Sequence, residues 1–168
     1  MKEYIHIMKI KEIIDEDFGN YRKCSMFIIF PKCNLKCDKE NHNNYCQNSK
    51  LLKEPNKDIS YDEICKRYIN NPLSHALVFG GLEPFDSLDD MTNLISKLRY
   101  TYHCNDDIVI YTGYTEEELI DKIAYLRFKH CLPLLIKFGR FRPDQESHLD
   151  NLLGVQLAND EQYAKWVT

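Results

Sequence analysis

Three cysteines stand in one polar stretch of the chain and could together bind a metal centre. Cys33 and Cys37 are separated by three residues, and Cys46 follows nine positions further on. The hydrophobic run 26–30 before them predicts a buried strand, so their thiols would converge on the loop that leaves it. Three thiolates leave one iron of a four-iron cluster without a protein ligand, which opens a position for a substrate or cofactor.

Two other interpretations of these cysteines stay open. His42 lies in the same loop and could complete a zinc site, although zinc sites usually pair cysteines two to four residues apart in two knuckles. Alternatively, the thiols are free and buried. Because thiolates are the usual ligands of iron–sulfur clusters, the pattern favours iron–sulfur over zinc. The four remaining cysteines are scattered, and we expect inert core positions for them: Cys24, Cys65, Cys104 and Cys131.

Two glycine-containing segments follow expected strands and could approach a ligand. Gly80 and Gly81 come after the apolar run 76–79, and Glu83 adds an acceptor to strand-end carbonyls that could bind an ammonium group. The pair at 112–113 follows the run 108–111 in the same way. An ordinary strand-to-helix turn is the alternative interpretation at both places.

Strand and helix patterns alternate along the chain. Capping boxes at Ser60 and Thr115, with a third cap signal at Ser87, each predict the start of a helix, the first over 61–70. A terminal helix is expected over 161–166. The strands expected from apolar runs are 26–30, 76–79, 108–111 and 132–138, with a strand or hairpin arm in 4–14 and a last short strand in 152–157.

This alternation predicts the fold class. Crossovers of about thirty residues are typical of βαβ units and a parallel sheet, so we expect an α/β protein with parallel strands and flanking helices. A complete eight-fold barrel takes ~250 residues, so one domain over 1–168 can form only part of a barrel or an open sheet. In either fold the segments after the strands gather on one face.

Composition limits the partners and the compartment. The formal net charge of −4 and a pI of about 5.9 argue against nucleic acid or an anionic membrane as a partner. No apolar run approaches the ~20 residues of a membrane helix, and the N-terminus has no signal-peptide core. Seven cysteines, an odd number of which four are scattered, do not suggest a disulfide framework, so we expect a cytoplasmic protein.

The order of these motifs resembles the radical S-adenosylmethionine (SAM) superfamily. Within it, the chain is most similar to the activating proteins of anaerobic (class III) ribonucleotide reductase. The resemblance runs from about Met8 to Gln162 and is carried by five segments: Cys33-x3-Cys37, Tyr45-Cys46-Gln47-Asn48, Phe79 to Phe85, Ile110 to Leu119, and the tail 139–162.

The resemblance implies a partial (β/α) barrel of the radical SAM type with one 4Fe-4S cluster on Cys33, Cys37 and Cys46. SAM would chelate the fourth iron through its amino and carboxylate groups, with Gly81, Leu82 and Glu83 meeting the amino group. The cofactor-binding residues that it implies are Tyr45, Asn48, Gly80, Gly81, Leu82, Glu83, Thr112 and Gly113.

The implied activity is that of a glycyl-radical activase. A flavodoxin- or ferredoxin-like donor would reduce the cluster, which cleaves SAM to methionine and a 5′-deoxyadenosyl radical. That radical would take a hydrogen atom from a glycine in the glycyl-radical domain of the reductase large subunit, under anaerobic conditions in the cytoplasm.

The sequence departs from the family pattern in two places. The superfamily usually has two residues between its second and third cysteines, whereas here the eight residues 38–45 intervene, and Gly-Leu-Glu-Pro stands for the usual Gly-Gly-Glu-Pro. A loop absorbs inserted residues at little cost because closure entropy grows only logarithmically with length. The alternatives are a radical SAM enzyme acting on another glycyl-radical enzyme or a small molecule, and a non-catalytic zinc-binding scaffold.

Overall fold

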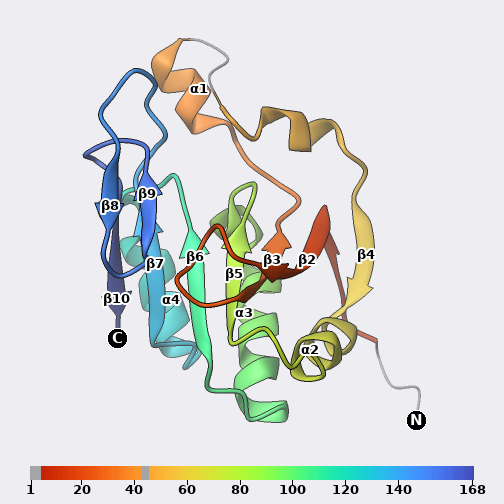
Figure 1. The fold of residues 1–168 in the computed structure, drawn as a ribbon. Coiled ribbons are helices and arrows are strands. Elements are labelled where there is room, and N and C mark those ends of the chain that lie inside the picture. Colours follow the sequence, from red (N-terminus) through yellow and green to blue (C-terminus); the bar gives the residue numbers. More distant parts are fainter. Residues whose placement is uncertain (1–4, 43–45) are drawn as a thin grey trace.

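The computed structural model describes residues 5–42 and 46–168, and a six-stranded sheet runs through its centre (Figure 1). The spatial order of its strands is β10-β7-β6-β5-β3-β2. The inner four strands are parallel and the two outer strands are antiparallel to their neighbours. Their bounds are β2 Glu12–Asp17, β3 Ser25–Ile29, β5 Ala76–Gly80, β6 Asp107–Tyr111, β7 Leu134–Phe138 and β10 Tyr163–Val167.

Helices cover one face of the sheet, and two of the three predicted cap signals form their hydrogen bonds, whereas the Ser87 side chain makes no cap hydrogen bond. The main helices are α2 (Tyr61–Ile69), α3 (Leu88–Ser96), which continues as the π-helical turn Lys97–Thr101, and α4 (Ile120–Phe128). Ser60 Oγ accepts from Glu63 N at 3.1 Å, as expected of an N-cap. Thr115 and Glu118 form a reciprocal capping box before the 3₁₀ turn Glu117–Leu119 and α4.

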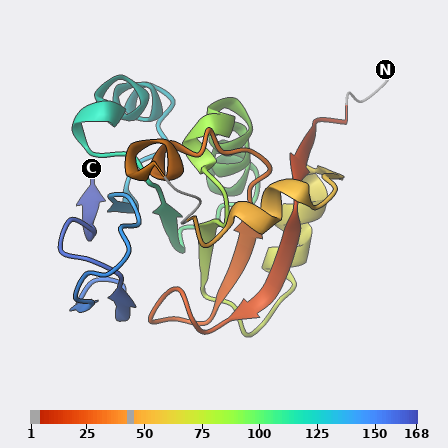
Figure 2. The same cartoon turned by 90° about the horizontal axis from the view of Figure 1, so that it is seen from above.

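The opposite face of the sheet is covered by irregular segments and a short hairpin. The hairpin pairs β8 (His148–Asp150) with β9 (Val155–Leu157), and it lies beside β7 with the β2–β3 connection on the same side (Figure 2). Tyr21, Leu153 and Leu157 are buried against the sheet there. Because both faces are covered, all five residues of β5 and of β7 are buried.

A second, two-stranded sheet lies before α2. β1 (Ile7–Ile10) pairs antiparallel with β4 (Lys57–Ser60), and β4 leads directly into α2. Met8, Ile10 and Ile59 point into the main core and are nearly inaccessible to solvent. The remaining short helices are α1 (Lys36–Asn41) and the 3₁₀ segments Ser49–Lys53 and Pro84–Ser87.

The four strands and three helices expected from the apolar patterns are confirmed to within a few residues. The terminal helix over 161–166 is wrong, because Tyr163–Val167 forms β10 and pairs with β7 along its whole length. The polar stretch 140–151 contains β8. The partial barrel stays a prediction. None of the helices in 5–42 and 46–168 has the length and apolar character needed to cross a membrane.

Candidate functional site

The carboxyl ends of the four parallel strands surround a cavity of about 480 Å³. Segments that follow β3, β5, β6 and β7 line it, together with residues 155–158 in and after β9. Such strand-end crevices are where α/β proteins usually bind ligands. The sequence-predicted site residues that line the cavity are Cys33, Cys37, Cys46, Asn48, Gly81, Leu82, Glu83, Thr112 and Gly113.

Two predicted residues and one alternative ligand are not placed in the cavity. A Cβ on Gly80 would stand 3.0 Å from the Phe27 ring, so this glycine serves packing between strands instead of lining the site. Tyr45 lies outside the described residues. His42, the alternative zinc ligand, is exposed at the end of α1 and does not line the cavity.

The cysteine loop folds so that its thiols face the same space. Leu35 adopts a left-handed conformation and its N–H donates to Cys33 Sγ at 3.3 Å. α1 begins at once, with Cys37 in its first turn. Asp38 Oδ1 accepts from Cys46 N at 2.6 Å, which brings Cys46 back beside α1 despite the inserted residues.

α1 lies above the ends of the strands (Figure 1), and charged side chains attach it there. Arg140, which follows β7 and is only 6% exposed, contacts Glu40 at 2.8 Å and Glu118 at 2.7 Å. Lys36 also pairs with Glu118. The Arg140 guanidinium, with help from Lys36, holds the pKa of Glu118 at about 2.

The cysteine thiols are partly removed from water. Burial raises the pKa of Cys33 to about 12 and also raises the pKa of Cys46. A cluster would bind the deprotonated thiolates, so its binding must release protons. Cys37 lies beside the segment after β6, since a Cβ at Gly113 would be in van der Waals contact with Cys37 Sγ at 3.4 Å.

A buried carboxyl group faces the same cavity from the segment after β5. Glu83 is 6% exposed and accepts from Thr112 Oγ1 at 2.8 Å and from Gly113 N at 2.9 Å. It also accepts from Phe85 N at 3.1 Å. Burial raises the pKa of Glu83 to about 7 in spite of these hydrogen bonds.

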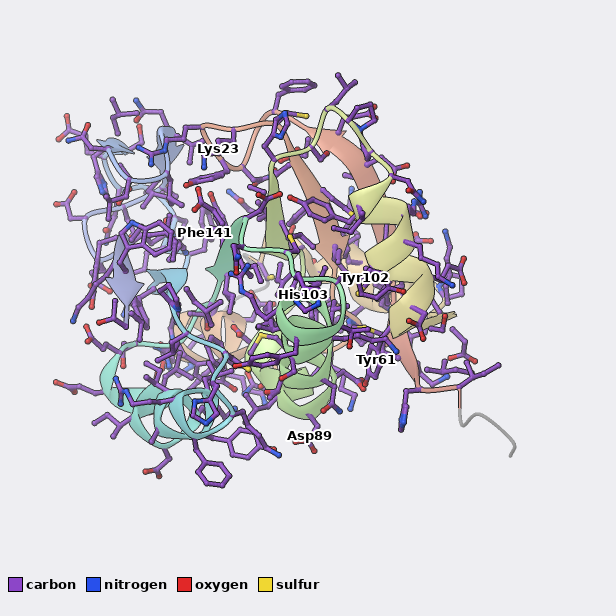
Figure 3. The ribbon with its side chains drawn as sticks, turned by 90° about the horizontal axis from the view of Figure 1, so that it is seen from below. Lys23, Tyr61, Asp89, Tyr102, His103 and Phe141 are labelled. Carbon is purple, nitrogen blue, oxygen red and sulfur yellow. The ribbon has the colours of Figure 1, made fainter. Side chains whose placement is uncertain are left out.

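Lys137 on β7 is a cavity residue that the sequence reasoning missed. It is 6% exposed, its Nζ donates to Gly139 O at 2.8 Å, and burial lowers its pKa to about 8. A lysine inside the apolar run 134–138 was the available signal, because lysine is almost never buried without a partner. Phe141, labelled in Figure 3, and Gln162 also line the cavity and were missed.

Gly81 is required by the backbone itself. It has a φ of +78°, and a Cβ at this position would lie 2.4 Å from Ile29 Cγ2. A bulky residue here would displace β3 as well as block a ligand. A variant such as Gly81→Val could therefore lose cofactor binding through a change in the fold, and it is not a clean test of the site.

A cavity with polar groups at the carboxyl ends of parallel strands is typical of α/β proteins that bind a cofactor there. The chain belongs to the 4Fe-4S single cluster domain family, whose model matches residues 19–157. It is therefore an iron–sulfur protein that binds a 4Fe-4S cluster. No curated protein and no solved structure matches the chain significantly.

The donor set at the cavity fits such a cluster. Cys33, Cys37 and Cys46 line it and lie within the matched residues, whereas Cys65, Cys104 and Cys131 are buried in the core. In 5–42 and 46–168, no three Cys, His, Asp or Glu side chains converge closely enough to hold a single metal ion.

Proposed function

We propose that the protein is a radical SAM activase that installs a glycyl radical on anaerobic ribonucleotide reductase, acting as a single radical SAM domain over 1–168 with a partial (β/α) barrel fold. The observation that carries this proposal is the composition of the cavity. Three cysteines stand on one side, and a buried carboxyl and a buried amine, Glu83 and Lys137, line the same space.

This pair of buried groups is complementary to the amino-acid part of SAM. Its amino group can donate to Glu83 through its N–H bonds while the nitrogen lone pair is given to iron, and its carboxylate can accept from Lys137. Burying an ionisable group is costly without a suitable partner, so both side chains gain from a ligand that brings a donor to one and a carboxylate to the other. The cavity of about 480 Å³ is within the usual size range of small-molecule sites.

Different residues of the chain would bind the cluster and SAM. Cys33, Cys37 and Cys46 would hold three irons, and the amino and carboxylate groups of SAM would complete the fourth. The bound cluster would supply the electron that cleaves SAM into methionine and a 5′-deoxyadenosyl radical, for transfer to a glycine of the partner. Tyr45, Asn48, Leu82, Thr112 and Gly113 are the further residues proposed for SAM.

The partner is proposed from sequence resemblance together with the nature of the cavity rim. The segment 110–119 and the tail 139–162 carry the likeness to the reductase activases. Glu40 and Arg142, on the segments that follow β3 and β7, are partly exposed and opposite in charge, which suits a polar and transient protein contact. A flavodoxin- or ferredoxin-like protein would supply the electron, and the reduced state of all seven cysteines suits a reducing cytoplasm.

The test combines binding, cleavage and radical transfer. Anaerobically reconstituted protein should bind SAM in calorimetry and release 5′-deoxyadenosine when reduced. Mixed with a class III reductase from the same source, it should produce a glycine-type doublet in the electron paramagnetic resonance spectrum. That doublet should vanish when the reductase glycine is changed to alanine. Rapid SAM cleavage without a radical on the reductase would contradict the proposed partner and favour another glycyl-radical enzyme or a small-molecule substrate.

A further inference from the structure

A closed ring of hydrogen bonds holds the turn between Cys33 and Cys37. Asn34 N donates to Asp86 Oδ2 at 3.0 Å, and Asn34 Nδ2 donates to Tyr114 Oη at 2.8 Å. Tyr114 Oη in turn donates to Asp86 Oδ1 at 2.6 Å, which closes the ring. These three residues come from segments that follow three different strands, β3, β5 and β6.

The Asn34 side chain connects this ring to the shape of the cysteine turn. Its Oδ1 accepts from Lys36 N at 3.0 Å, so the amide bridges the turn from within while its nitrogen reaches Tyr114. The positions of Cys33 and Cys37, one residue before and three residues after Asn34, are therefore linked to the orientation of Asn34. A rotation of this side chain would change the spacing of the two thiols.

Tyr114 is itself held firmly on the strand-end side. Its backbone N donates to Thr112 Oγ1 at 3.0 Å and its carbonyl accepts from Gly139 N at 3.0 Å. Lys36 and Lys122 stand over its ring, at 5.5 and 5.0 Å from the centroid. The hydroxyl is thus presented to the cysteine turn from a rigid base.

We infer that Tyr114, acting through Asn34 and together with Asp86, is a positioning residue for the iron–sulfur cluster. Its hydroxyl fixes the relative placement of Cys33 and Cys37 through its hydrogen bond with Asn34. The inference rests on the part of the proposed function that makes these two cysteines cluster ligands, but not on SAM as the second cofactor.

The test compares Tyr114→Phe with Tyr102→Phe in reconstituted full-length protein. Tyr102 also donates its hydroxyl to an aspartate, Asp62, at 2.8 Å, but at the opposite end of the molecule, which Figure 3 shows from below. Phenylalanine keeps the ring over which the two lysines stand. Partners that orient metal ligands typically change metal affinity by 10–100-fold, so we expect release of iron to a chelator about tenfold faster in Tyr114→Phe. The g-values and midpoint potential of the reduced cluster should shift with it.

The control and a double variant decide the outcome. Tyr102→Phe should release iron at the wild-type rate with unchanged g-values, and both variants should have similar thermal midpoints. Tyr114→Phe combined with Asn34→Ala should be no faster than Asn34→Ala alone, because the two residues act in one chain of contacts. Wild-type iron release, g-values and potential in Tyr114→Phe, or additive effects in the double variant, would overturn the inference.

Failure of the proposed function gives a different pattern. If the wild-type protein holds its cluster but binds no SAM, the proposed reaction is wrong, and the difference between Tyr114→Phe and Tyr102→Phe remains as expected. If the cluster forms without Cys33 and Cys37, the positioning inference is overturned together with the ligand assignment.

Discussion

The two ends of the parallel strands use similar polar side chains in different ways. At the amino ends, Tyr68 donates to Asp106 at 2.6 Å, and Arg99 Nη1 donates to the carbonyls of Cys104 and Asp106 at 2.7 and 2.8 Å. Tyr21 donates to Asp107 at 2.8 Å in the same region. Each of these groups has a partner of matching chemistry within the fold, and burial and Asp106 raise the pKa of Tyr68 so that its hydroxyl stays protonated.

At the carboxyl ends, two ionisable groups are buried beside a cavity instead. Glu83 is held by a hydroxyl and two backbone N–H groups, and Lys137 donates to a backbone carbonyl. Both pKa values are moved toward neutrality, to about 7 and about 8. The comparison indicates that the amino ends contribute stability, whereas the carboxyl ends keep buried groups available to a ligand.

The largest expected effect is loss of the cluster when a ligand cysteine at the carboxyl ends is removed. Cys33→Ala, Cys37→Ala and Cys46→Ala should each lose most iron and all SAM cleavage, because the proposed cluster needs three thiolates. Iron and sulfide analysis after anaerobic reconstitution measures this. Cys24→Ala is the control, since Cys24 directly precedes β3 at the amino end, and it should keep a full cluster. A full four-iron complement in Cys46→Ala would show that the third ligand is assigned wrongly.

The second effect concerns ligand binding without loss of stability. Lys137→Met should weaken SAM binding by at least about tenfold, the cost of losing one charge-assisted contact. The thermal midpoint should not fall, because methionine removes a buried ammonium group from an apolar strand. Calorimetry and thermal unfolding measure the two quantities. Lys97→Met, which removes a pair with Asp62 outside the cavity, should leave SAM affinity unchanged. Equal SAM affinity in Lys137→Met and wild type would remove Lys137 from the site.

The third effect should appear only in stability. Tyr68→Phe removes a hydrogen bond to a carboxylate at the amino ends, which should lower the free energy of unfolding by about 2 kcal/mol. Iron content and SAM affinity should stay at wild-type values. Urea unfolding and iron analysis of the same preparation test the contrast. A changed iron content in Tyr68→Phe would show that the two ends are not independent.

The smallest effect is a pH dependence at the carboxyl ends. Arg140 and Lys36 lower the pKa of Glu118 to about 2, below its ordinary value of 4.5, so the folded state favours the ionised carboxylate. This contribution is complete above the unfolded pKa and is lost as pH falls from ~5 toward ~2. The difference in unfolding free energy between wild type and Glu118→Gln should therefore be larger near pH ~6 than near pH ~3. A difference that grows on acidification would contradict this assignment.

Local patterns in the sequence were enough to place most elements of the fold. The buried strands follow apolar runs, Ser60 caps its helix, and Thr115 and Glu118 form both hydrogen bonds of the capping box that their spacing predicts. The last strand could not be found in this way. Tyr163–Val167 is a strand because β7 offers it an open edge, and that edge exists only once the sheet has formed.

The sequence by itself also determined which loop carries the cysteines and which segments follow the strands. Only the tertiary structure decided how these segments meet. Glu83 contacts Thr112, Tyr114 contacts Asn34, and Lys137 lines the same cavity as Glu83. Neither strand nor helix periodicity relates these residues to one another. These contacts depend on the register in which parallel strands pair, and that register is set by packing across the whole sheet.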